Sequence, residues 1–354
     1  MKVAVVGGGI NGLCSAWMIA QKGHQVSLFE SEHLMGKTSM SSSKLLHGGL
    51  RYLENFEFRL VKEALKERQW WLNHVPALTR RLPILYPIYK TSRSRIKIKL
   101  GLMLYDFLAG KKGIGRHRWL EPRQVKRCSP HLNQKDLAGA YLFFDGQMDD
   151  RALGLWVATQ CRNLGVEILE QTPVQSVDEK GNLTTSEQVL QFDKIINVAG
   201  PWSVELLRKS NISPAQNLDL VRGSHLLLPS ISMFGHLLEV PNESRVVFVL
   251  PFKKKTLVGT TEVRQSIDEP IKCSDDEQQY LLRLYNHYFK GRLCEADVLS
   301  RYAGLRPLVA GDEESASKAS REYEIFSSGR LISVFGGKWT TARALGQSVA
   351  DKIQ

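Results

Sequence analysis

The chain has 354 residues, enough for two domains, because a single hydrophobic core stops growing at roughly 250–300 residues. Its 43% hydrophobic and 24% charged residues are those of an ordinary folded protein, so the composition excludes a disordered chain. The formal net charge of +12 is unevenly placed along the sequence, which favours contact with an anionic partner.

The cysteines and the first residues indicate a reducing compartment. The cysteines are scattered, odd in number and without a CxxC pair, which argues for free thiols. Met1 is followed almost at once by a strand-forming run, so we expect no signal peptide. The longest apolar stretch, Leu100 to Ala109, contains Asp106 and is too short to span a bilayer. We therefore expect a cytoplasmic protein that at most attaches peripherally to the inner face of the cytoplasmic membrane.

The first thirty residues predict a dinucleotide-binding unit. Lys2–Val6 suits a buried parallel strand, and it enters a turn in which Gly7, Gly9 and Gly12 have the G-x-G-x-x-G spacing. Gly7 permits the tight turn, Gly9 lets backbone N–H groups approach a diphosphate, and Gly12 lets the following helix pack close to the strand. Glu30 ends the next strand, where a carboxylate can accept both hydroxyls of an adenosine ribose. The alternative is a glycine-rich turn that binds nothing.

The remaining elements predict an α/β fold with an α+β second domain. Helices are predicted over residues 58–71, 150–163, 275–289 and 339–353, and strands over residues 26–29, 139–144, 166–169, 174–177, 192–198, 218–228, 246–252, 256–260 and 330–335. Strands 166–169 and 174–177 are expected to return to the first domain, and a second small-residue turn at Gly200 follows strand 192–198. We expect a discontinuous Rossmann-like domain (1–80, 140–205 and 328–354) and an antiparallel-sheet substrate domain (81–139 and 206–327).

Residues 80–119 form a basic segment. It holds eleven Lys or Arg residues against one acid, Asp106, which leaves a charge of +10. Interleaved apolar residues favour an interfacial element on anionic lipid, with a nucleic-acid patch less favoured. The other alternative is a solvated basic face over a local core. Residues 95–100 alternate like a strand whereas 100–108 fit a helix better, so the period does not decide the structure.

Nine stretches carry a resemblance over nearly the whole chain. They are GGGINGLCSA at 7–16, TSMSSSKLLHGGLRYLENFEFRLVKEAL at 38–65, NVAGPW at 197–202, RGSH at 222–225, VVFVLPF at 246–252, GTTEV at 259–263, YAGLRPL at 302–308, SREY at 320–323 and FGGKWTTAR at 335–343. In these stretches, and in their order, the chain resembles the FAD-dependent, aerobic and membrane-associated glycerol-3-phosphate dehydrogenases of the D-amino-acid-oxidase-like group. The SKLLHGGLRYLE run is specific to that family, whereas the glycine turn is not.

The chain departs from the family pattern in three places. Glu262 stands where the family's GTTDV segment has Asp, and Trp339 and Ala342 interrupt the GGKLTTYR pattern. The family's helical C-terminal domain is not found before the sequence ends at Gln354. The first two departures leave the substrate open, and the third leaves the oligomeric state and the electron acceptor open.

The resemblance implies an FAD-dependent oxidation of sn-glycerol 3-phosphate to dihydroxyacetone phosphate. Hydride would pass to flavin N5, and the electrons would pass to a quinone at the membrane. One alternative keeps the fold but oxidises a 2-hydroxy or 2-amino acid. Another is an inactive flavin-binding paralogue that acts as a binding protein.

The resemblance also implies the residues of the site, with FAD as cofactor and no metal. The implied FAD contacts are Gly7, Gly9, Gly12, Glu30, Thr38, Ser39, Ser43, Val174, Gly200, Gly337, Lys338 and Thr340. A helix beginning near Lys338 or Trp339 would aim its N-terminal N–H groups at the flavin N1/C2=O edge, where hydride transfer develops negative charge.

The substrate and the proton require further groups. By resemblance, Arg306, Arg321 and Lys338 gather the substrate phosphate, whose oxygens suit the planar fork of arginine. Arg51 and Tyr52 would face the reacting side of the flavin. The candidates for the general base are, in order of preference, His225, Glu262 and His47.

Overall fold

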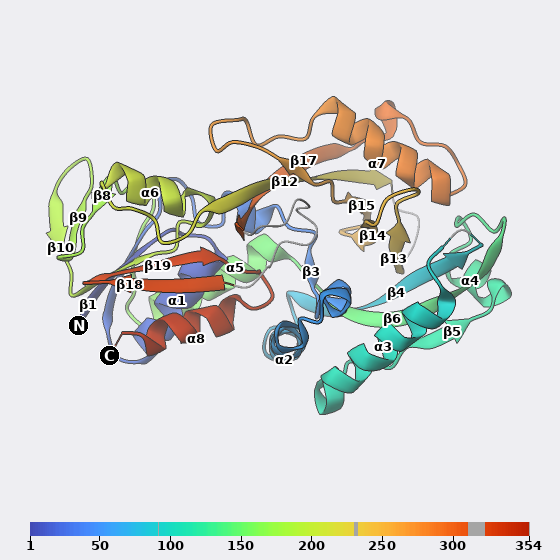
Figure 1. The fold of residues 1–354 in the computed structure, drawn as a ribbon, viewed down its shortest axis with the longest axis horizontal. Coiled ribbons are helices and arrows are strands. Elements are labelled where there is room, and N and C mark those ends of the chain that lie inside the picture. Colours follow the sequence, from blue (N-terminus) through green and yellow to red (C-terminus); the bar gives the residue numbers. More distant parts are fainter. Residues whose placement is uncertain (91, 230–232, 311–322, 354) are drawn as a thin grey trace.

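A computed structural model describes residues 1–90, 92–229, 233–310 and 323–353. In it, two large sheets stand next to each other, each with helices on its faces (Figure 1). The predicted mixed α/β architecture, with a Rossmann-like unit and a largely antiparallel second sheet, is confirmed.

The first sheet has six strands in the order β18-β19-β11-β1-β2-β7. Their bounds are β1 (Lys2–Val6), β2 (Gln25–Phe29), β7 (Glu167–Leu169), β11 (Lys194–Asn197), β18 (Tyr323–Ser328) and β19 (Leu331–Gly336). All neighbours are parallel except β18, which runs antiparallel to β19. The short, apolar β1 lies in the middle of this sheet, as its β-branched run predicts.

The two faces of the first sheet are covered by different layers. Val3 and Val5 point into a core with α1 (Ile10–Gln21), α5 (Asp150–Asn163) and α8 (Ala342–Asp351). Ala4 and Val6 point to the other side, where α6 (Ser203–Lys209) and a small antiparallel sheet pack. The strands of that small sheet are β8 (Ser176–Val177), β9 (Asn182–Thr184) and β10 (Val189–Gln191).

The second sheet has ten strands, eight of them in the order β16-β12-β15-β14-β13-β4-β6-β3, with β17 beside β12 and β5 beside β6. The bounds are β3 (Leu45–Leu46), β4 (Thr79–Tyr89), β5 (Arg118–Leu120), β6 (Leu137–Met148), β12 (Leu218–Pro229), β13 (Gly235–Glu239), β14 (Val246–Phe252), β15 (Lys255–Gly259), β16 (Val263–Arg264) and β17 (Ser300–Val309). All strand pairs in this sheet are antiparallel except the β13–β4 pair, which is parallel.

Helices cover both faces of the second sheet. On one face, α3 (Arg95–Ala109) packs through Ile98 and Leu102. On the other face lie α4 (Pro122–Cys128) and α7 (Asp275–Tyr288), and α2 (Phe58–His74) lies beside α3. The structure also has short 3₁₀ helices: η1 (Thr38–Met40), η2 (Leu50–Asn55), η3 (Gly110–Lys112), η4 (Gly200–Trp202) and η5 (Glu295–Asp297).

The strand-like alternation at residues 95–100 is misleading, because the whole run is helical in α3. This helix has apolar side chains on two sides, which hides its period. One row, Ile98, Leu102, Tyr105 and Ala109, is buried, and a second row, Ile96, Leu100, Met103 and Phe107, is exposed. Both rows have the i, i+4, i+7, i+11 spacing of a helix face.

Two other predicted elements differ in the structure, and one predicted domain boundary falls within a strand. Residues 174–177 do not return to the first sheet, because only β8 forms and it pairs with β9. The last helix begins at Ala342 rather than near Lys338, so a turn and not a helix terminus reaches the site. The predicted domain boundary at residue 140 falls inside β6, which lies wholly in the second sheet. The division into two domains otherwise stays a proposal.

Among the residues that the structure describes, no helix combines the length and the apolar character needed to cross a bilayer.

Candidate active site

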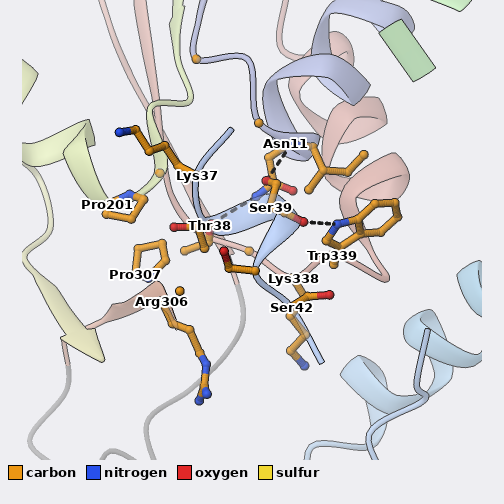
Figure 2. Close-up of a pocket in the computed structure, with 18 of the residues that line it drawn as sticks. Asn11, Lys37, Thr38, Ser39, Ser42, Pro201, Arg306, Pro307, Lys338 and Trp339 are labelled. Atoms are coloured by element: carbon orange, nitrogen blue, oxygen red, sulfur yellow. Dashed lines mark hydrogen bonds between the residues drawn. The ribbon is translucent and has the colours of Figure 1, made fainter. Parts of the chain in front are cut away.

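A cavity of about 620 Å³ lies where the carboxyl ends of β1, β11 and β19 meet the second sheet. Its walls come from the first glycine turn, the loop over residues 36–52, the turn over residues 336–340, and strands β12, β14 and β17. Parallel sheets bind ligands outside the carboxyl ends of their strands, so this is the place where a dinucleotide is expected. Figure 2 shows several of the lining residues.

The first glycine turn has no space for side chains. Gly7 has a φ of +117°, and a Cβ on Gly12 would lie 1.8 Å from the Gly7 carbonyl oxygen. A Cβ on Gly9 would lie 2.9 Å from Ser39 Oγ. Glu30 accepts a hydrogen bond of 2.7 Å from the Gly8 amide, so its carboxylate closes the turn at the end of β2. This cradle fits a dinucleotide with a diphosphate against the N-terminus of α1.

The serine-rich loop is held between the two sheets. Ser39 Oγ accepts a 3.0 Å hydrogen bond from the Ile10 amide, and Thr38 Oγ1 donates one of 2.8 Å to the Leu305 carbonyl oxygen. Trp339 Nε1 donates to the Ser39 carbonyl oxygen at 3.0 Å, which joins the last turn to the same loop (Figure 2). Trp339, one of the departures from the family pattern, therefore fixes the wall of the cavity.

A buried ion pair anchors the next part of this loop. The Lys44 ammonium lies 2.8 and 2.9 Å from the two carboxylate oxygens of Asp150, and both side chains are almost fully buried. Burial lowers the pKa of Lys44 and raises that of Asp150, while each charge opposes the shift of the other. Ser42 Oγ also donates to Asp150, at 2.7 Å. Removing one partner would leave an uncompensated buried charge, so the pair strongly favours this position of the loop against α5.

A second buried carboxylate, Glu277 of α7, fixes the opposite wall. It accepts hydrogen bonds from Thr261 Oγ1 at 2.6 Å and from Ser224 Oγ at 2.8 Å, and it pairs with Arg222 at 3.1 Å. Burial opposes ionisation of Glu277, but its hydrogen bonds and Arg222 outweigh burial and lower its pKa. Ser224 precedes His225, and Thr261 precedes Glu262, so Glu277 holds the backbone of both cavity segments from behind.

Glu262 is surrounded by three guanidinium groups. Its Oε1 lies 3.7 Å from Arg51 Nη1 and 3.8 Å from Arg306 Nη1, and its Oε2 lies 3.3 Å from Arg245 Nε. Arg306 also donates to Thr260 Oγ1 at 2.7 Å. Arg51, Arg306 and Glu262 line the cavity, while Arg245 contacts Glu262 but is not among the lining residues. Within the described residues, these three arginines and Glu262 together carry a formal charge of +2, which is equal in size and opposite in sign to the charge of a phosphate dianion.

His225 lies in the cavity wall on β12 and is 2% exposed. Its ring stacks on Tyr302, with 4.9 Å between the ring centroids, and Nε2 is 2.8 Å from Ser43 Oγ. Within the described part of the chain, Nδ1 has no hydrogen-bond partner, which is unusual for a buried atom outside functional sites. Burial, followed by the charges of Arg306 and Lys44, holds the pKa of His225 well below its usual value, so the imidazole is neutral at neutral pH.

The Lys338 ammonium stands over the Tyr52 ring, 3.6 Å from its centroid. The ring centroids of Tyr52 and His47 are 6.1 Å apart. All three side chains line the cavity, so the loop over residues 47–52 and the last turn face each other there.

The structure brings nearly all predicted site residues together around one cavity. Those that line the cavity are Gly7, Gly9, Glu30, Thr38, Ser39, Ser43, His47, Arg51, Tyr52, Val174, Gly200, His225, Glu262, Arg306, Gly337, Lys338 and Thr340. Gly12 packs against Gly7 instead, and Arg321 lies outside the described residues. Sequence reasoning missed Arg245, Asp150 and Glu277 as residues that support the site; Asp150 pairs with Lys44 across 106 residues, and Glu277 accepts from Ser224 across 53.

Residues 2–352 match the family model described as FAD dependent oxidoreductase, so the chain belongs to this family and uses FAD. A D-erythritol 1-phosphate dehydrogenase from Brucella abortus is 35% identical over 99% of this chain and 73% of its own length. A glycerol-3-phosphate dehydrogenase from Pseudomonas aeruginosa is 36% identical over 99% of this chain and 71% of its own length. The sequence-based resemblance to glycerol-3-phosphate dehydrogenases is therefore confirmed.

Solved structures agree with this assignment. The glycerol-3-phosphate dehydrogenase from Bacillus halodurans, complexed with FAD, has a TM-score of 0.79 and 25% identity. That match covers 99% of this chain but 64% of the other, so the chain spans less than two thirds of that protein. An L-alpha-glycerophosphate oxidase from Mycoplasma pneumoniae, with a TM-score of 0.77 and 18% identity, shows the same fold.

Proposed function

We propose that the protein oxidises sn-glycerol 3-phosphate to dihydroxyacetone phosphate, with FAD as hydride acceptor at N5 and a quinone as the next electron acceptor. The observation that carries this proposal is the cluster of Arg51, Arg306 and Arg245 around Glu262. Two of its arginines line the cavity, and the excess of positive charge complements a phosphate dianion better than a single carboxylate. A 2-hydroxy or 2-amino acid is therefore the weaker candidate substrate.

The cavity residues divide the remaining tasks. Arg51 and Arg306 bind the phosphate, with Arg321 contributing by family resemblance. The Gly7 turn, Glu30 and the serine-rich loop hold the cofactor, which supplies the hydride acceptor when bound. Lys338 places a positive charge at the last turn, where it stabilises negative charge that develops in the reaction.

His225 is proposed to take the hydroxyl proton as the hydride leaves. The ring is neutral and oriented by Ser43 and Tyr302, so it can accept a proton without first losing one. Glu262 is the weaker candidate for this role, because its carboxylate is shared among three arginines. We assign Glu262 the task of spacing Arg51 and Arg306.

The membrane contact proposed for residues 80–119 is supported by α3. Its exposed row includes Ile96, Leu100 and Phe107, which are 70%, 60% and 79% exposed. Exposed basic side chains on the same helix include Lys97 and Lys99. An apolar row with flanking cations fits an anionic lipid surface, and it fits nucleic acid less well. We therefore propose a peripheral attachment to the inner face of the cytoplasmic membrane, where a quinone is available.

Anaerobic bleaching of the flavin absorbance tests the proposed reaction. Purified protein with bound FAD is mixed with sn-glycerol 3-phosphate, D-erythritol 1-phosphate, glycerol or D-lactate. We expect rapid bleaching by sn-glycerol 3-phosphate and none by glycerol or D-lactate, because neither carries the phosphate. Faster bleaching by D-erythritol 1-phosphate would show that this compound, and not sn-glycerol 3-phosphate, is the preferred substrate. No bleaching by any of the four compounds would support a binding protein without turnover.

A further inference from the structure

A buried cluster of three side chains lies behind the loop that carries His47, Arg51 and Tyr52. Arg68 of α2 donates to Asp145 of β6 at 2.6 Å, and the Tyr105 hydroxyl of α3 donates to the same carboxylate at 2.9 Å. All three side chains are nearly inaccessible to solvent. Arg68 and Asp145 neutralise each other, so the cluster adds no net charge to the core.

Two members of the cluster accept a hydrogen bond from the Gly48 backbone amide of the loop, and the Tyr105 ring also packs with Tyr52 and Leu53. The Gly48 N–H donates to Tyr105 Oη at 2.8 Å and, more weakly, to Asp145 Oδ1 at 3.2 Å. Burial raises the pKa of Tyr105 well above its ordinary value, so the hydroxyl keeps its proton. It can therefore donate to Asp145 while it accepts from Gly48.

The packing at this amide is tight. A Cβ on Gly48 would lie 2.4 Å from Tyr105 Oη and from Leu65 Cδ2, so the glycine is required there by the neighbours and not by flexibility. Gly49 has a φ of +78°, and a Cβ there would lie 2.0 Å from Tyr52 Cδ2. The absence of side chains at Gly48 and Gly49 therefore allows the loop backbone to lie close to Tyr105.

The Gly48 amide lies next to the wall of the cavity. Gly48 is flanked by residues that line it: His47 on one side and Gly49 through Tyr52 on the other. Tyr105 itself belongs to α3, whose opposite face carries the exposed apolar row. The Tyr105 hydroxyl therefore adds a hydrogen bond to the apolar packing that already connects α3 with the loop that presents Arg51 and Tyr52.

We propose that Tyr105 is a positioning residue for the reaction: its hydroxyl fixes the Gly48 amide and so places Arg51 and Tyr52 for substrate binding. The inference rests on the proposed function, because Arg51 and Tyr52 matter in it as substrate contacts. It assigns a role in the site to a residue of the basic segment that touches neither the cavity nor the cofactor cradle.

The test is Tyr105→Phe, which keeps the ring and removes the hydroxyl, with Tyr89→Phe as the matched control. The Tyr89 hydroxyl donates to the Asn133 carbonyl oxygen at 2.8 Å, and neither residue lines the cavity. For Tyr105→Phe we expect a KM for sn-glycerol 3-phosphate about tenfold higher, the usual scale for one lost buried hydrogen bond, with kcat within about twofold. FAD content and Tm should stay close to those of the parent protein.

Two further measurements separate positioning from general stability. Hydrogen exchange should become faster at residues 46–53 in Tyr105→Phe and stay unchanged there in Tyr89→Phe. The flavin absorbance change on titration with inorganic phosphate should require about tenfold more phosphate in Tyr105→Phe. Unchanged exchange and unchanged phosphate binding in Tyr105→Phe would overturn the proposal, as would equal effects in Tyr89→Phe. If sn-glycerol 3-phosphate fails to bleach the parent protein, the proposed function fails, while exchange and phosphate titration still decide the role of Tyr105.

Discussion

Ser43 Oγ lies 2.8 Å from His225 Nε2, and this hydrogen bond joins the loop beside the first sheet to strand β12 of the second. The imidazole is buried and neutral, which is the state that a general base needs before the reaction. We predict that His225→Ala lowers the rate of flavin reduction by at least about a hundredfold, the usual contribution of a general base, while FAD stays bound. Stopped-flow flavin reduction measures the rate, and absorbance measures FAD content.

Ser43→Ala provides the comparison for this prediction. It keeps the imidazole and removes the group that orients it, so we expect a smaller loss, about tenfold in flavin reduction. Near-normal reduction in His225→Ala would remove His225 from the role of base. A loss of FAD in that variant would instead make it a cofactor contact.

The arginine cluster predicts a defect in substrate affinity. Arg306→Gln removes a guanidinium group of the cavity wall and leaves the Glu262 carboxylate with fewer counter-charges. We expect KM for sn-glycerol 3-phosphate to rise at least about thirtyfold, because truncating one partner of a desolvated charge pair typically costs about 2–5 kcal/mol. Steady-state kinetics with a soluble acceptor measure this value.

Arg264→Gln is the matched control for Arg306→Gln. Arg264 is half-exposed on β16 and pairs with Asp219 at 2.8 Å, away from the cavity. Exposed ion pairs contribute little, so KM should stay within about twofold of the parent value. Equal effects of the two substitutions would show that the overall positive field, and not a specific contact, attracts the substrate.

The sequence predicts those parts of the site that depend on local pattern. The Gly7 turn and Glu30 are separated by one helix and one strand, so spacing alone is enough to relate them. The serine-rich loop and the HGG run are likewise continuous stretches, and their residues line the cavity as a group. Their assignment needs the family pattern, but not any long-range pairing.

What could not be predicted depends on partners far apart in the chain. Lys44 and Asp150 are 106 residues apart, and Arg68 and Asp145 are 77 apart, with no local pattern to relate either pair. Glu277 has the sequence position of a helix-capping residue, and it does take part in the capping of α7. Its hydrogen bond with Ser224 forms only because β12 packs against α7, and no local pattern predicts that contact. The period of α3 is hidden in the sequence because both of its faces carry apolar residues.

The buried His236 predicts a loss of stability in mild acid. This residue is fully buried on β13, its Nε2 lies 2.9 Å from Ser129 Oγ, and burial lowers its pKa to about 4. The unfolded chain has the ordinary histidine pKa of 6.5, so between pH 6.5 and about 4 the unfolded state binds a proton at this histidine and the folded state does not. Stability should therefore fall as the pH falls through this window, by roughly 3 kcal/mol in total.

Chemical denaturation from pH 7 to pH 4 measures this slope. His236→Asn should be less stable at pH 7 and should show a flatter slope, because its side chain does not titrate. The control is Asn73→Ala on the surface of α2, which replaces a side chain that does not titrate and should keep the slope of the parent protein. His225 adds to the slope in the same direction, so a residual slope in His236→Asn is expected. An unchanged slope in that variant would contradict the prediction.

The exposed row of α3 predicts a salt-sensitive attachment to anionic membranes. In the double variant Leu100→Glu/Phe107→Glu, two exposed apolar side chains become acids, which removes apolar insertion and repels anionic lipid. We expect at least about tenfold weaker binding to anionic vesicles in flotation, since each basic residue near such a surface contributes about 1 kcal/mol and each added acid opposes it. Turnover with a soluble acceptor should not change.

Val189→Glu is the control for this double variant, because Val189 is 65% exposed on β10, in the layer beside the six-stranded sheet. It should bind vesicles like the parent protein. Raising the salt from about 0.1 M to 1 M shortens the Debye length from about 10 Å to 3 Å, so the parent protein should dissociate from the vesicles. Vesicle binding that changes with neither salt nor the α3 substitutions would place the membrane contact on another surface, and the exposed apolar row of α3 would then have to be explained by a protein partner.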